Sequence, residues 1–85
     1  MPEISRFFGI IIRMFYNDHE PPHFHAVYGE HEISVEIESG TIHGEFPVRA
    51  LRLVLEWANL HKQELIENWQ IARQGQPLKR VPPLE

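Results

Sequence analysis

Hydrophobic and polar residues alternate along much of the first half of the chain, which predicts β-strands there. The stretch Phe7–Tyr16 is rich in aromatic and β-branched residues and predicts one buried strand after a short lead-in over residues 2–5. Gly9 inside it indicates a bulge or a close backbone approach. Residues 23–28 and 31–38 alternate between apolar and polar positions, so each predicts a strand with one apolar face.

Turn-forming residues separate these segments. Residues 17–22 contain Asn, Asp and two prolines and predict a loop. Gly29-Glu30 is typical of a two-residue hairpin turn with Gly first, and Ser39-Gly40 is a second turn candidate before a short strand over residues 41–46. These segments predict a small antiparallel sheet of about four strands.

The hydrophobic period becomes helical at Pro47, a residue that suits the first turn of a helix. Two helices, or one kinked helix, are expected from about residue 47 to 74, and Gly75 is a natural stop. The fold class is therefore α+β, with the helices covering one face of the sheet. Residues 1–75 are expected to form a single compact domain, and the Pro-rich residues 76–85 an extended C-terminal tail.

Strand pairing through two-residue hairpins would bring histidines and glutamates onto one sheet face. Side chains that lie directly opposite each other in a sheet have Cβ atoms about 5 Å apart. The two rows expected on this face are His23–Glu36–His43 and His25–Ser34–Glu45. The apolar residues of the same segments fall on the other face, ready to pack under the helices.

A carboxylate between two imidazoles suits a divalent metal such as zinc. The expected ligands are His23, Glu36 and His43, and His19 or Asp18 from the loop is available to close the site.

The same residues also suit acid–base catalysis, because one imidazole can take a proton while another gives one. His23 and His25 are then the catalytic pair, and Glu36 fixes a tautomer; such a pair with a nearby cation is enough for metal-independent, ribonuclease-like chemistry. Two alternatives without chemistry stay open. The face is either a solvated polar surface, or it binds a protein partner, as an exposed strand edge also can.

Composition narrows these possibilities. The chain has no cysteine, which excludes disulfides and thiolate metal sites. Its net charge of −4 argues against RNA as a ligand, because proteins that bind phosphates usually carry a basic balance.

The longest apolar run, Phe7–Ile12, is too short to cross a bilayer, and the start lacks the pattern of a secretory signal. A cytoplasmic protein without a membrane segment is expected.

The segments PEISRFFGIIIRMFYNDHEPPHFHAVYG, RALRLVLEW and ELIENW resemble the bacterial family known as domain of unknown function 4160. The resemblance covers nearly the whole chain. The motif positions are Asp18, His19, Pro21, Pro22, His23, Phe24 and His25. The resemblance implies a small bacterial protein of a toxin–antitoxin-like pair, with a cognate small protein as partner, and it assigns no catalytic role to the motif. Self-association also stays open.

Overall fold

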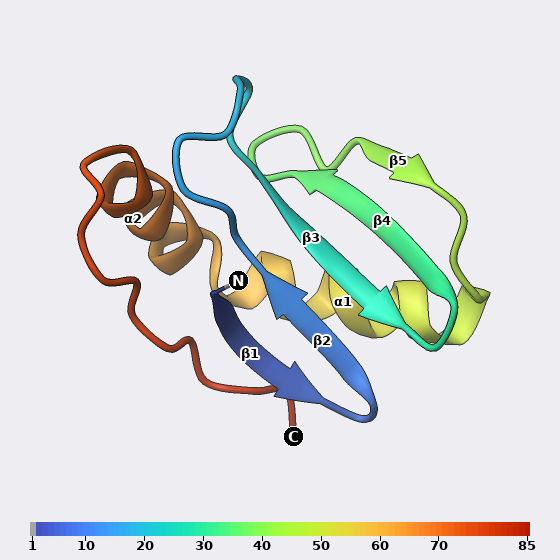
Figure 1. The fold of residues 1–85 in the computed structure, drawn as a ribbon. Helices are drawn as coiled ribbons and strands as arrows, with labels where there is room; N and C mark the ends of the chain where they lie inside the picture. Colours follow the sequence, from blue (N-terminus) through green and yellow to red (C-terminus); the bar gives the residue numbers. More distant parts are fainter. Residues whose placement is uncertain (1) are drawn as a thin grey trace.

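The structure, a computed structural model, describes residues 2–85. Its strands form one antiparallel sheet in sequence order, and two helices follow (Figure 1). The elements are β1 (Glu3–Phe7), β2 (Ile10–Arg13), β3 (His23–Tyr28), β4 (His31–Glu36), β5 (Ile42–Gly44), α1 (Val48–Leu60) and α2 (Lys62–Arg73). The predicted α+β class is confirmed, and the described residues form five strands.

The prediction of one strand over Phe7–Tyr16 was wrong, because the chain reverses at Phe8-Gly9 and pairs β1 with β2. Phe8 has a φ of 49° and Gly9 a φ of 81°, so both turn residues are left-handed, as a tight hairpin requires. For a bulky residue such as Phe8 this conformation costs about 1–2 kcal/mol. Phe7 and Phe8 before Gly9 and three isoleucines after it hid the turn within an apolar run.

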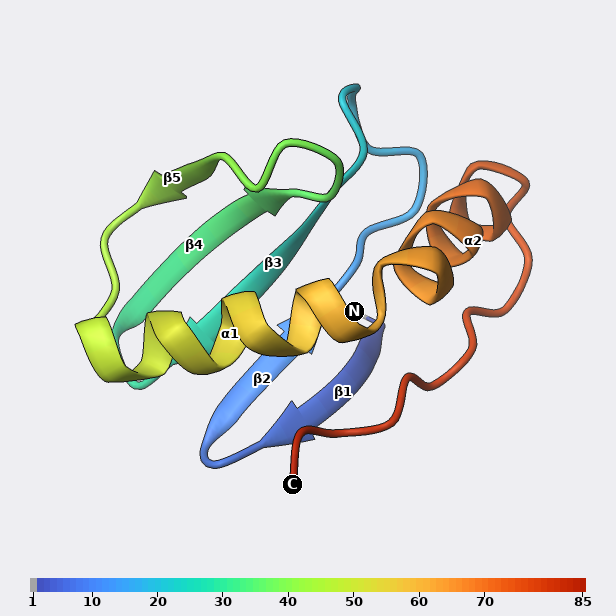
Figure 2. The ribbon, with the colours of Figure 1, turned by 180° about the vertical axis from the view of Figure 1, so that it is seen from behind.

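Helix α1 lies across one face of the sheet, while α2 lies at the end of the sheet beside the loop between β2 and β3 (Figure 2). The interface between α1 and the sheet is apolar, and the Trp57 and Phe24 rings meet edge to face with centroids 5.7 Å apart. The buried residues of this interface include Phe24, Ala26, Ile33, Val35, Ala50, Val54 and Trp57. The expected apolar face of the sheet therefore forms the core.

The two helices meet at His61, which leaves helical geometry with φ −116° and ψ 26°. The chain therefore contains two helices and not one kinked helix. No helix within residues 2–85 has the length and apolar character needed to cross a membrane.

Residues 76–85 have no regular secondary structure and return along β1 (Figures 1 and 2). The Val81 amide donates to the Ile4 carbonyl oxygen at 2.8 Å, and the Trp57 indole N–H donates to the Pro82 carbonyl oxygen at 2.8 Å. The buried side chain of Asn68 makes two hydrogen bonds to the backbone of Lys79, at 2.8 and 3.0 Å. These contacts cover part of the outer edge of the sheet, which would otherwise present unpaired backbone groups.

Replacing Asn68 with Ala should lower the free energy of unfolding by about 2 kcal/mol, because both hydrogen bonds to the Lys79 backbone are lost. Urea unfolding measures the change. Gln70→Ala, on the exposed side of the same helix, is the control and should stay within roughly 0.5 kcal/mol of wild type. Equal effects of the two substitutions would show that the tail is not held through Asn68.

Candidate functional site

Two histidines of β3 and one aspartate of the preceding loop converge at the start of β3. His23 and His25 are two residues apart on the strand, so their rings project from the same face. Asp18 Oδ2 lies 2.9 Å from His23 Nε2 and 3.6 Å from His25 Nε2. One ligand atom from each residue lies within 4.8 Å of the other two. This group, the Asp18/His23/His25 triad, has the donor set of a two-histidine, one-carboxylate metal site.

Contacts with the end of β4 and with α2 hold the loop that carries Asp18. The Ile37 amide donates to the Pro22 carbonyl oxygen at 3.0 Å, which ties the loop to the end of β4. Arg73 at the end of α2 forms an ion pair with Glu20. Within the loop, Asp18 Oδ1 accepts a hydrogen bond from the next amide, at 2.8 Å, which orients its carboxylate.

His23 is buried, with 5% of its surface exposed, and each ring nitrogen faces an oxygen. Nδ1 lies 2.9 Å from the Pro21 carbonyl oxygen, which can only accept, so Nδ1 carries the proton. Nε2 faces Asp18 Oδ2. In the neutral ring this nitrogen presents a lone pair to a carboxylate, so a positive charge, either a second proton or a metal ion, is needed between them. The Trp69 ring of α2 packs beside the imidazole, with centroids 5.2 Å apart.

His25 has a looser arrangement on a more open side of the triad. Its Nδ1 lies 3.5 Å from Glu32 Oε2, and its ring meets the Phe15 ring edge to face. Its Nε2 is buried and has no hydrogen-bond partner among residues 2–85. Both histidines thus have an acceptor near Nδ1 and direct Nε2 toward Asp18. The hydrogen bond from His23 Nδ1 is of the kind that orients the histidine ligands of metal sites, and Glu32 is the nearby acceptor for His25.

The electrostatics of the triad favour an ionised Asp18. Partial burial acts to raise the pKa of this carboxyl group, but the His19 amide and the imidazoles of His23 and His19 outweigh it. The net result is a pKa below the ordinary value of 3.8. Asp18 is therefore a carboxylate at neutral pH.

The predicted rows are partly correct. The structure pairs His23 with Glu36 and His25 with Ser34, as expected. The pairing of Glu36 with His43 was wrong: His43 lies opposite Ser34, and Glu45 lies outside the strands.

The physical reason is the turn after β4. The amide of Gly40 bonds the carbonyl oxygen of Glu36 at 2.9 Å, and the amide of Glu36 bonds the carbonyl oxygen of Thr41, so the loop spans four residues and not two. The resulting shift by two residues keeps His43 on the expected face. Its Nε2 reaches Glu36 Oε2 diagonally, at 2.9 Å.

The remaining predicted residues surround a cavity of about 100 Å³ next to the triad. It is lined by His19, Pro21, His23, His25, Ser34, Glu36 and His43. The cavity exists because the small Ser34 side chain lies between His25 and His43 in one cross-strand row. His19 is exposed and stacks on His23 with ring centroids 5.0 Å apart. The structure therefore gathers the predicted residues other than Glu45 but places Asp18, named from sequence only as a closing ligand, at the centre.

Glu36 is held as a carboxylate on the far side of this cavity. Hydrogen bonds from His43 and Ser39 lower the pKa of its side chain below the ordinary value. The Ser39 hydroxyl donates to Oε1 at 3.1 Å, while His43 binds Oε2. Glu36 is therefore the hydrogen-bond partner of His43 and is not one of the three converging side chains.

The family model for the domain of unknown function (DUF4160) matches residues 9–70. The match covers most of the chain, so the protein belongs to this family, as the resemblance indicated. It includes all three residues of the triad. Searches of curated proteins and of solved structures gave no match.

Replacing Asp18 with Asn should destabilise the fold in a pH-dependent way. Because the pKa of Asp18 is lower in the folded chain than in the unfolded one, its carboxylate stabilises the fold above about pH 4. That contribution is lost as the pH falls through the lowered pKa. We expect Asp18→Asn to unfold about 1 kcal/mol more easily at pH 6, with the difference from wild type vanishing in acid.

Urea titrations between pH 6 and pH 2 measure this difference. Glu30→Gln is the matched control, since Glu30 is exposed and forms no ion pair with any residue from 2 to 85. A gap between Asp18→Asn and wild type that does not change with pH would mean that the carboxylate charge is not what holds the loop.

Proposed function

We propose that this protein binds one divalent transition-metal ion, such as zinc, through Asp18 Oδ2 and the Nε2 atoms of His23 and His25. The observation that carries the proposal is the convergence of two Nε2 atoms on one carboxylate oxygen, while an oxygen lies near each Nδ1. Zinc lies about 2.0–2.1 Å from imidazole nitrogen and about 2.0–2.2 Å from carboxylate oxygen. A tetrahedral ion therefore separates its ligand atoms by about 3.3 Å, close to the distances of 2.9 and 3.6 Å within the triad.

Three protein ligands leave one coordination position free, which is the arrangement of catalytic zinc sites. That position would face the cavity lined by Ser34, Glu36 and His43. His19 stacks over the triad and is the side chain best placed to supply an exchangeable fourth ligand.

The second candidate is metal-independent acid–base chemistry on RNA by His23 and His25, with Glu36 on the opposite strand. It is supported by the two oxygens around His23, which suit a protonated imidazole acting as an acid. In this proposal the protein is the cytoplasmic member of a toxin–antitoxin-like pair with a cognate small protein. The net charge of −4 favours the metal site over RNA.

Calorimetric titration of untagged, EDTA-treated protein with Zn²⁺ tests the metal site. We expect one equivalent to bind, and His25→Ala to weaken binding at least 100-fold. Saturation at 100 times the dissociation constant should stabilise the fold by about 2.7 kcal/mol, or roughly 10–20 °C in melting temperature. His31→Ala is the control, since His31 is exposed and outside the triad. Binding that survives in His25→Ala, or no binding at all, would reject the site.

RNA incubated with EDTA-treated protein separates the second candidate from the first. Acid–base catalysis predicts cleavage that persists in EDTA and disappears in His25→Ala but not in His31→Ala. Cleavage that requires added Zn²⁺ would assign the chemistry to the metal centre instead, and no cleavage under either condition would remove RNA as the substrate.

A further inference from the structure

An apolar groove lies at the opposite end of β3 from the triad. The tips of the β1–β2 and β3–β4 hairpins and the start of α1 come together there (Figure 1). The groove has a volume of about 250 Å³. It is lined by Phe8, Ile10, Tyr28, Pro47, Arg49, Ala50 and Leu53. Only one of these side chains carries a charge, so the groove is suited to an apolar group.

Packing in the core does not explain why an aromatic residue, Phe8, stands at the hairpin tip. Its side chain is 59% exposed, and its backbone is in the left-handed region, where Asn, Asp or Gly is usual. Tyr28 is also partly exposed, at 38%, and packs against Gly9, where a Cβ atom would lie 3.3 Å from the Tyr28 ring. A strained, exposed aromatic residue beside a groove suggests a binding role.

One arginine, Arg49, lies in the lining of the same groove, and a second, Arg52, lies one turn further along α1. Arg49 and Arg52 are exposed on the first turns of α1, three residues apart and therefore neighbours on the helix surface. Neither forms an ion pair or side-chain hydrogen bond within residues 2–85. The first turn of α1 has no acidic residue, although a helix N-terminus disfavours cations. Arg49 is therefore an exposed cation in the groove lining that has no ion-pair partner among residues 2–85.

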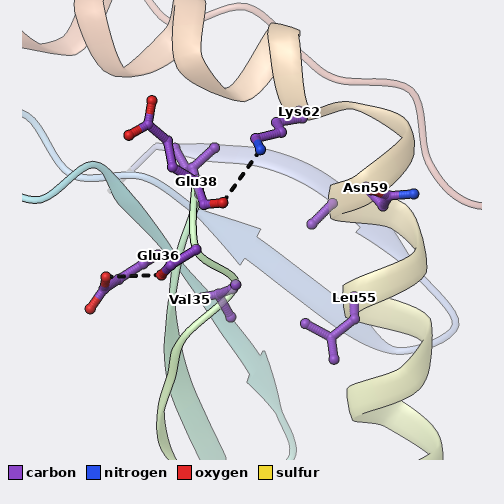
Figure 3. Close-up of a pocket in the computed structure, with 10 residues that line it drawn as sticks. Val35, Glu36, Glu38, Leu55, Asn59 and Lys62 are labelled. Carbon is purple, nitrogen blue, oxygen red and sulfur yellow. Dashed lines mark hydrogen bonds between the residues drawn. The ribbon is translucent and has the colours of Figure 1, made fainter.

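A second groove, between the β4–β5 loop and the helices, lacks these features. Lys62 there donates to the Glu38 carbonyl oxygen at 3.4 Å, and the carboxylate of Glu36 is bonded within its own loop (Figure 3). Lys62 and Glu36 therefore each have a partner within this groove, whereas the arginine that lines the first groove has none among residues 2–85.

We propose that the groove beside Phe8 binds an acidic peptide segment of a partner protein, which inserts an apolar side chain between Phe8 and Tyr28 and places its carboxylates against Arg49 and Arg52. The apolar lining favours a side chain over a nucleotide. Two cations are also few for a nucleic-acid ligand, whose affinity depends on many phosphate contacts. The surface is separate from the triad and does not depend on a bound metal.

Fluorescence anisotropy with three labelled, end-capped hexapeptides tests this proposal. We expect EELFEE to bind at least tenfold more tightly than EEAAEE, which lacks the apolar side chains, and than KKLFKK, which has the wrong charge. Binding should weaken as salt rises, since the charges are exposed. The affinity for EELFEE should be the same with and without EDTA. A negative result in this experiment would therefore not count against the zinc site, and a negative zinc titration would not count against the groove.

Two variants locate the binding on the protein. Phe8→Asn removes the aromatic ring, while Asn adopts the left-handed conformation readily, so the melting temperature should be unchanged or higher. Arg49→Glu reverses one charge at the groove, and Lys79→Glu makes the same change on the C-terminal tail. We expect Phe8→Asn and Arg49→Glu each to reduce EELFEE affinity at least fivefold, and Lys79→Glu to leave it within twofold.

Three results would overturn the proposal. EELFEE could bind no better than EEAAEE, or the Phe8→Asn and Arg49→Glu variants could bind it as wild type does. A labelled uridine dodecamer could also bind more tightly than EELFEE and lose affinity in both variants, which would assign the surface to RNA.

Discussion

The hydrogen bonds of the buried His23 imidazole hold the loop between β2 and β3 against the sheet. A polar ring in the interior must have partners, and it finds them in the Pro21 carbonyl oxygen and the Asp18 carboxylate. Both partners belong to the loop between β2 and β3, while Trp69 of α2 packs against the ring. One side chain therefore joins sheet, loop and second helix, and the loop that satisfies it also brings Asp18 toward His25.

Strand β3 organises the rest of the molecule through simple alternation. Phe24 and Ala26 lie against α1 in the core, while His23 and His25 occupy the other face. The triad at one end and Tyr28 at the other are roughly 17 Å apart along the strand. Strand β3, paired on both sides, thus separates the polar triad from the apolar groove.

Membership of the DUF4160 family describes ancestry and fold and leaves the chemistry to be argued from the sites. The matched residues contain the triad and most of the groove, whereas Phe8 and the C-terminal tail lie outside them. The metal proposal rests on the burial of His23 and on the His25 Nε2 atom that has no hydrogen-bond partner among residues 2–85. The peptide proposal rests on the left-handed backbone of Phe8 and on the unpaired charge of Arg49 within the same residues. Both sites hold groups that the fold alone leaves without partners.

The sequence by itself determined what depends on neighbouring residues: the alternation of β3 and β4, the turn at Gly29-Glu30, and hence the pairing of His23 with Glu36. Tertiary structure decided what depends on distant contacts. The Phe8-Gly9 turn lay hidden in an apolar run, and the loop after Glu36 shifted His43 by two residues. Asp18 became central only because its loop closes over a buried imidazole and is tied to β4 and α2. Periodicity cannot predict such a closure, because the energy that stabilises it comes from residues far away in the chain.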